Sequence, residues 1–250
     1  MLTSLEREFS NLAARYANPL TQLPGNVPIN EHIEYLLQNQ VAFCVCYGDL
    51  DHFKPFNDIY GFHKGDEIIQ LAAKVIAGFC DPTQDFIGHI GGDDFIILFQ
   101  SHDWETRCQS ILKLFGECAS GFFSVEDHER NGCVTEDRHG RKAFHPLTSL
   151  SLGAVRVEPG MFASPYEVSF AATDAKKQAK KFPAIPSSWN AANGTRRPRA
   201  AQDGHRAPPY IVITSANSNT QHKTPALMTV CVIPATETSS CVWLNAHMPL

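Results

Sequence analysis

Hydrophobic residues recur at the spacing of one helix face in several stretches of the chain, with charged and polar residues between them. One of these stretches is Lys64–Phe79, where the apolar stripe runs from Ile68 to Ile76. Another begins at Pro28, a residue that suits the first turn of a helix. The pattern predicts helices over residues 1–17, 28–38, 53–60, 64–79, 104–118 and 166–182.

Shorter apolar runs rich in β-branched and aromatic residues predict strands over residues 41–49, 86–90, 95–99 and 147–157. The second and third runs flank Gly91-Gly92-Asp93-Asp94. Because Gly and Asp tolerate the positive φ of tight turns, we expect a β-hairpin here. Its tip would carry two carboxylates beside two glycines, so a ligand could approach the backbone closely. Taken alone, Gly-Gly-Asp-Asp also fits a simple surface turn.

A second group of polar residues follows the first predicted strand. Asp49 and Asp51 stand two residues apart at its end, so both can face one side. Carboxylates at a strand end, with others on a neighbouring hairpin, suit Mg²⁺, which takes oxygen ligands and often phosphate oxygens as well. Lys54 would be a phosphate partner, and Asn57 and Asp66 have groups that can hydrogen-bond a base edge. A solvated strand end is the alternative for Asp-x-Asp alone.

The order of these motifs resembles the GGDEF domain of the diguanylate cyclase family. Asp-Leu-Asp-x-Phe-Lys-x-x-Asn-Asp-x-x-Gly-x-x-x-Gly-Asp begins at Asp49, Gly-Gly-Asp-Asp-Phe begins at Gly91, and residues 18–26 resemble the family's entry motif. The resemblance covers about residues 18–182. It implies an α/β (α+β) fold in which a central, mostly antiparallel sheet is flanked by helices, related to the palm of nucleotide cyclases and polymerases. It also implies condensation of two GTP molecules into cyclic di-GMP with release of pyrophosphate.

The resemblance assigns metal ligands. Asp49, Asp94 and the backbone carbonyl of Leu50 would hold Mg²⁺, with two ions in each active site and Mn²⁺ as a possible substitute. Asp93 would lie at the metal or assist the attack of the 3′-hydroxyl in two-metal phosphoryl transfer. Because each subunit would hold one GTP, the active species would be a homodimer.

The resemblance also assigns substrate contacts. Backbone N–H groups near His52 and Phe53 would cradle phosphate, and Lys54 and Lys180 would neutralise its charge. Asn57 and Asp66 would read guanine, since a carboxylate accepts hydrogen bonds from its N1–H and amino group. Two further lysines of the last predicted helix, Lys176 and Lys177, are expected on a solvated face.

Several positions depart from the family pattern. Asp94 stands where Glu is usual and is one methylene shorter; Phe62 replaces a common histidine, and His89 replaces a frequent arginine. The usual Arg-x-x-Asp product site reads Pro82-Thr83-Gln84-Asp85, so its bidentate arginine contact is missing, and we predict weak or absent product inhibition. A catalytically degenerate domain that binds GTP or cyclic di-GMP as a regulatory module is therefore the alternative. An unrelated metal-binding fold is the third.

Composition limits the partners, the cellular location and the metal sites to be expected of this protein. The net charge of −5 gives no basic field for nucleic acid, and 43% hydrophobic residues support a core. No apolar run has membrane-spanning length and no signal-peptide pattern is present, so we expect a cytoplasmic protein without a membrane partner in this chain.

Cys44 and Cys46 are expected to be buried. A zinc site is disfavoured because its candidate ligands are irregularly spaced. Those ligands are Cys108, Cys118, Cys133, His128, His139 and His145.

Three segments lie outside the motifs. The helix over 1–17 would link or signal from an upstream sensor domain that is absent here, or simply pack on the domain. Residues 122–146 suggest an inserted hairpin.

From Pro183 onward lie eight of the sixteen prolines, and we predict disorder over 183–250. The family would place another strand there. One hypothesis is out-of-frame translation. Codons for Pro-Gly-Asn-Ser-Phe-Leu-Leu-Glu can be chosen so that loss of one guanine nucleotide gives the amino acids of residues 183–190. A genuine disordered extension is the alternative.

Overall fold

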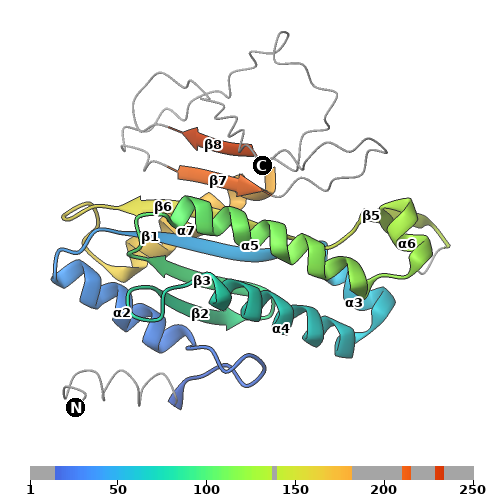
Figure 1. The fold of residues 1–250 in the computed structure, drawn as a ribbon, viewed down its shortest axis with the longest axis horizontal. Helices are drawn as coiled ribbons and strands as arrows, with labels where there is room; N and C mark the ends of the chain where they lie inside the picture. The colour runs from blue at the N-terminus through green and yellow to red at the C-terminus, as the bar shows by residue number, and fades with distance from the viewer. Residues whose placement is uncertain (1–14, 137–139, 182–209, 215–228, 234–250) are drawn as a thin grey trace, which may run out of the picture.

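The structure, a computed structural model, describes residues 15–136, 140–181, 210–214 and 229–233. At its centre is a six-stranded sheet in the order β2-β3-β1-β6-β7-β8, in which every neighbouring pair is antiparallel (Figure 1). This confirms the predicted sheet. Its strands are β1 Phe43–Asp51, β2 Phe86–Gly91, β3 Asp94–Phe99, β6 Ser149–Val157, β7 Tyr210–Thr214 and β8 Thr229–Ile233.

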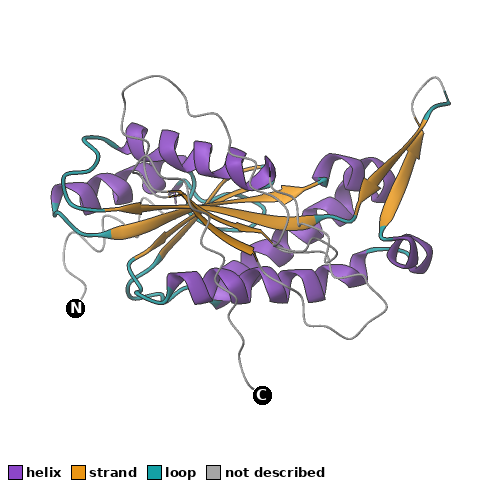
Figure 2. Ribbon diagram, turned by 90° about the horizontal axis from the view of Figure 1, so that it is seen from above, coloured by secondary structure: helices purple, strands orange, loops and turns teal. Residues whose placement is uncertain are grey.

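Helices cover both faces of the sheet (Figure 2). Alternate residues of β1 face opposite sides, so Cys44 and Cys46 pack with α4 and α5, whereas Phe43 and Val45 pack with α2 and α7. The predicted burial of Cys44 and Cys46 is thus confirmed. The helices are α2 Asn26–Gln38, α3 Phe53–Tyr60, α4 Phe62–Gly78, α5 Trp104–Ala119 and α7 Pro165–Lys181.

A small module lies at one end of the domain (Figure 1). It comprises η1 Ser120–Phe122, α6 Val125–Arg130, and the hairpin of β4 Gly132–Glu136 and β5 Lys142–Pro146, which forms its own two-stranded sheet. Lys64 on α4 donates a hydrogen bond to the carbonyl of Phe122 (3.4 Å), and the Tyr60 hydroxyl on α3 donates to Asp127. The module occupies the range in which the sequence suggests an inserted hairpin.

The structure describes only parts of the two ends of the chain. Most of the helix expected over 1–17 lies outside the described residues. Within the tail for which we predict disorder, Tyr210–Thr214 and Thr229–Ile233 are strands, and β7 pairs with β6, which differs from the expectation at these two segments. Both are short β-branched runs that can extend an existing sheet edge. The rest of the tail, with residues 183–190 of the frame hypothesis, lies outside the described residues. Among the described helices, none is long and apolar enough to cross a membrane.

Candidate functional site

Three carboxylates meet at the end of the central strands. The register of β1 and β3 places Asp49 directly opposite Asp94, and Asp93 is the last residue of the turn before β3. One carboxylate oxygen from each of the three lies within 4.8 Å of the others. Asp49 is only 3% exposed, and Asp93 and Asp94 are half-buried. The hairpin therefore presents its acids to the buried acid of β1, as the sequence predicts.

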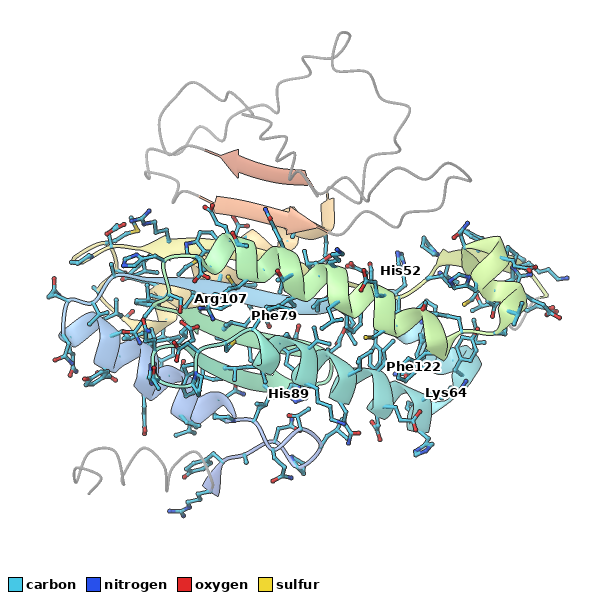
Figure 3. All side chains as sticks on the ribbon, viewed as in Figure 1. His52, Lys64, Phe79, His89, Arg107 and Phe122 are labelled. Atoms are coloured by element: carbon cyan, nitrogen blue, oxygen red, sulfur yellow. The ribbon has the colours of Figure 1, made fainter. Side chains whose placement is uncertain are left out.

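The hairpin turn depends on its glycines. Gly91 and Gly92 have φ of 147° and 59°, values that side-chain-bearing residues rarely adopt, and the ladder shifts register between His89 and Gly91. His89 on β2 (Figure 3) is buried, stacks on Phe95, and hydrogen-bonds the Gly92 carbonyl through Nε2 at 3.0 Å. Because a carbonyl only accepts, Nε2 carries the proton, and Nδ1 then accepts from the Thr21 hydroxyl at 2.8 Å.

Two lysines of α7 reach the acidic cluster. Nζ of Lys176 lies 2.7 Å from Oδ1 of Asp49 and also contacts Oδ1 of Asp94, and Nζ of Lys180 contacts Oδ2 of Asp49. The expectation that Lys176 lies on a solvated face is wrong: its side chain is 17% exposed and sits over the ring of Tyr47. The spacing of four residues from Lys180 is the signal that would have placed it on the same helix face. Lys177 is exposed as expected.

Burial and charge shift the titration of this cluster. Burial raises the pKa of Asp49 to about 6, although Lys176 and Lys180 pull it down. Burial also raises the pKa of Asp93, with a further contribution from the Asp94 charge. Burial alone would lower the pKa of Lys176, but its hydrogen bonds to Asp49 and Asp94 outweigh this and raise it. The cluster thus holds concentrated negative charge that positive groups must balance.

The donor set fits a hard divalent cation. Mg²⁺ prefers carboxylate and carbonyl oxygens, and here three carboxylates converge from two strands and a turn. Oδ2 of Asp49 is buried and, apart from its ion pair with Lys180, has no hydrogen-bond partner among the described residues. Leu50 lies between Asp49 and Asp51 on β1, and its carbonyl remains a predicted ligand. Asp51 is held apart, since its Oδ2 accepts from Ser149 Oγ at 2.9 Å and Ser151 Oγ at 2.5 Å.

Residues 16–122 match the family model described as diguanylate cyclase, GGDEF domain. These residues of the chain are a GGDEF domain. The chain is 34% identical over 120 residues to the bifunctional diguanylate cyclase/cyclic di-GMP phosphodiesterase MucR of Pseudomonas aeruginosa, covering 45% of this chain and 17% of that protein. It is 32% identical over 113 residues to the probable diguanylate cyclase DgcT of Escherichia coli, covering 44% of this chain and 24% of that protein.

A solved structure shares the fold of this GGDEF domain. The coiled coil and GGDEF domain of DgcB from Caulobacter crescentus, in complex with c-di-GMP, aligns with a TM-score of 0.50 at 22% identity. The alignment covers 71% of this chain and 87% of that one. The matched region of this chain spans less than a quarter of the length of the two curated relatives. The comparisons therefore place residues 16–122 in the GGDEF family, and the structural alignment shows the shared fold.

The other residues predicted to bind substrate lie on α3 or next to it. Lys54 is 86% exposed and pairs with Asp58 at 3.0 Å, so the structure does not bring it to the carboxylates. Asp66 is exposed on α4, whereas Asn57 packs against Gly65, and its buried Oδ1 has no hydrogen-bond partner among the described residues. His52 and Phe53 begin α3.

The backbone at the start of α3 adopts the left-handed conformation at His52. His52 has φ of 56° and is exposed, and Phe53 is the first residue of the eight-residue helix α3. The first N–H groups of a helix lack partners within the helix and point outward beyond its N-terminal end. The predicted phosphate-binding role of His52 and Phe53 therefore rests on their backbone rather than on their side chains.

Asp85 is a structural residue in this GGDEF domain. Its buried carboxylate accepts hydrogen bonds from the backbone N–H groups of Asp81, Gln100 and Ser101 and from Ser101 Oγ. Arg107 Nη1 lies 3.7 Å from it and donates to the carbonyl of Phe79 at 2.9 Å (Figure 3). Asp85 thus fastens the loop before β2, which leaves its carboxylate little capacity for a ligand.

The disfavoured zinc site gains no support from the structure. Cys108 is buried in the core beside Cys46, with the two sulfurs 3.7 Å apart, whereas Cys118 is exposed at the end of α5. Cys133 belongs to the inserted hairpin, and His139 lies outside the described residues. In the part of the chain that the structure describes, Asp49, Asp93 and Asp94 are the group that meets the geometric requirement for a metal site.

Proposed function

We propose that this GGDEF domain is a diguanylate cyclase that condenses two GTP molecules into cyclic di-GMP and releases pyrophosphate. The observation that carries the proposal is the facing pair Asp49 and Asp94, with Asp93 beside them and Lys180 reaching in from α7. Over the matched segment its relatives include the bifunctional diguanylate cyclase/cyclic di-GMP phosphodiesterase MucR and the probable diguanylate cyclase DgcT, which supports the same chemistry.

Asp49, Asp94 and the carbonyl of Leu50 would hold the Mg²⁺ ions, or Mn²⁺ in their place. When bound, the ions would neutralise the GTP phosphates and activate the attacking 3′-hydroxyl. Asp93 would assist this attack from its place beside Asp49 and Asp94 in the carboxylate cluster.

The residues around the metal ligands would hold the nucleotide. Lys180, whose side chain is 41% exposed, would turn from Asp49 to the phosphates. The N–H groups at His52 and Phe53 would cradle phosphate, with Lys54 as a further positive charge. Asn57 and Asp66 would bind the guanine edge, where the Oδ1 of Asn57, unpaired among the described residues, offers an acceptor. Because each domain would hold one GTP, two copies would face each other in a homodimer.

A regulatory domain that binds GTP or cyclic di-GMP without turnover is the second candidate. Lys176 favours it, because this ammonium already contacts both Asp49 and Asp94. The shorter side chain of Asp94 also favours it, since Mg²⁺ requires near-octahedral geometry.

Incubation of the purified protein with GTP and Mg²⁺, followed by chromatography of the nucleotides, tests the proposal. Cyclic di-GMP made by the wild type and not by Asp94→Ala supports the cyclase. Calorimetric GTP binding without product would favour the regulatory candidate, and neither product nor binding would refute both.

A further inference from the structure

Lys176 occupies the centre of the acidic cluster. Its Nζ lies 2.7 Å from Oδ1 of Asp49 and also contacts Oδ1 of Asp94, so one ammonium bridges the two acids that face each other across β1 and β3. These are two of the residues to which the proposed function assigns the metal, so any role of Lys176 in metal binding rests on that proposed function.

A divalent cation and this ammonium need the same oxygen atoms. Mg²⁺ binds carboxylate oxygens at about 2.0–2.1 Å. A lysine ammonium has three donors and no acceptor, so it cannot join the coordination shell of a cation. Two positive charges a few ångströms apart also repel strongly where burial lowers the dielectric constant. Lys176 in its present position and a bound metal therefore exclude each other.

Moving the backbone of α7 away to relieve this conflict would break its close packing on the sheet. The helix packs closely on β6 at Gly153, where an added Cβ atom would lie 2.4 Å from the backbone nitrogen of Lys176. The ammonium is also held 4.5 Å from the centroid of the Tyr47 ring. Rotation of the Lys176 side chain leaves this packing intact, and it gives up two ion pairs and a ring contact.

Lys180 differs in each respect. Its side chain is 41% exposed, against 17% for Lys176, and its ion pair with the cluster is to Asp49 Oδ2 alone among the described residues. It can reach solvent or a bound phosphate without abandoning a buried position. The two lysines thus have separate roles, although they lie one turn apart on the same helix.

We propose that Lys176 sets the affinity of the acidic site for its divalent cation. Its ammonium is an internal competitor that balances the carboxylates when no metal is bound and must be displaced before metal binds. A neutral side chain at position 176 strengthens metal binding, whereas a side chain that keeps the positive charge does not.

Binding of Mn²⁺ to the purified full chain, measured by the loss of the free-ion signal in electron paramagnetic resonance, tests this. The comparison includes the wild type, Lys176→Met, Lys176→Arg, and the matched control Lys177→Met, which removes a charge from the exposed neighbouring position. We expect Lys176→Met to lower the Kd by about tenfold or more, because it removes a positive charge at the ligand oxygens. Lys176→Arg and Lys177→Met should stay within about twofold of the wild type on the same electrostatic argument.

Asp94→Asn separates this proposal from the proposed function. If Asp94→Asn abolishes Mn²⁺ binding but Lys176→Met binds no more tightly than the wild type, the role of Lys176 is refuted and the metal site stands. If neither the wild type nor Lys176→Met binds Mn²⁺, both are refuted. Thermal unfolding of each variant checks the fold. If Lys176→Met lacks a cooperative transition, Lys176→Gln, which keeps a donor for the carboxylates, takes its place under the same criteria.

Discussion

Asp49 and Asp94 face each other across the β1–β3 ladder, although 44 residues of sequence between them contain two helices and a strand. The pairing puts two carboxylates on the sheet face that α7 covers. Like charges at this distance repel, so the arrangement requires cations. Lys176 and Lys180 supply them in this structure. At the proposed metal site, bound cations would take the place of these ammonium groups.

The close approach of α7 to β6 predicts a large effect of Gly153→Ala. The new Cβ would lie 2.5 Å from the carbonyl carbon of Ala175 and 2.4 Å from the nitrogen of Lys176, so helix and strand must separate. Overpacking of this kind costs about 1–3 kcal/mol of unfolding free energy. Urea unfolding measures the loss. Gly116→Ala is the control, because this α5 glycine has no atom within 4 Å of an added Cβ among the described residues.

Gly92→Ala tests the hairpin turn without adding a clash. No atom of the described residues lies within 4 Å of a Cβ at Gly92, but its φ of 59° is unfavourable for alanine. The left-handed conformation costs about 1–2 kcal/mol for a residue with a Cβ. We expect urea unfolding to show a loss of this size. A variant as stable as the wild type would mean that the turn can change its backbone conformation.

The buried His89 predicts a pH dependence of stability. Burial lowers its pKa below the ordinary value of 6.5, so the unfolded chain binds this proton at a higher pH than the folded chain. Its contribution to stability is therefore present above pH 6.5 and is lost as the pH falls towards the folded pKa. The slope from this one proton is at most about 1.4 kcal/mol per pH unit.

Unfolding of the wild type and His89→Gln between about pH 7.5 and 5 measures this contribution as the difference between the two slopes. The variant should lose less stability on acidification. His63→Gln, which alters an exposed histidine of α4, should follow the wild type. Parallel curves for wild type and His89→Gln would contradict the expected role of His89.

The network around Asp85 predicts weak or absent product inhibition. Its carboxylate is occupied by backbone N–H groups and Ser101, and the segment before it lacks the arginine of the family's product site. Calorimetric titration with cyclic di-GMP should show no tight binding at this loop. Tight binding that is lost in Asp85→Ala, provided that this variant remains folded, would contradict the prediction.

The sheet, the hairpin and the acidic cluster were predictable because their signals are local. The alternation in β1 places Asp49 on the face opposite to that of Cys46, and the Gly-Gly pair of the turn forces Asp93 and Asp94 to the hairpin tip. Lys176 was missed although its spacing of four residues from Lys180 puts both lysines on one helix face. Which way that face points depends on how α7 packs against β6, a contact between segments distant in sequence. The predicted substrate roles of Lys54 and Asp66 are untested, since both side chains are exposed and would need a nucleotide to draw them in.

We propose that the facing carboxylates Asp49 and Asp94 of this GGDEF domain support cyclic di-GMP synthesis. The most direct test is the amount of cyclic di-GMP formed from GTP and Mg²⁺ by the wild type, Asp49→Asn and Asp103→Asn, the last altering an exposed aspartate on another part of the surface. We expect product from the wild type and Asp103→Asn, and a loss of at least about a hundredfold in Asp49→Asn, in line with removal of a key electrostatic group. Equal product from Asp49→Asn and the wild type, or no product from any of the three, would contradict this role of the facing carboxylates.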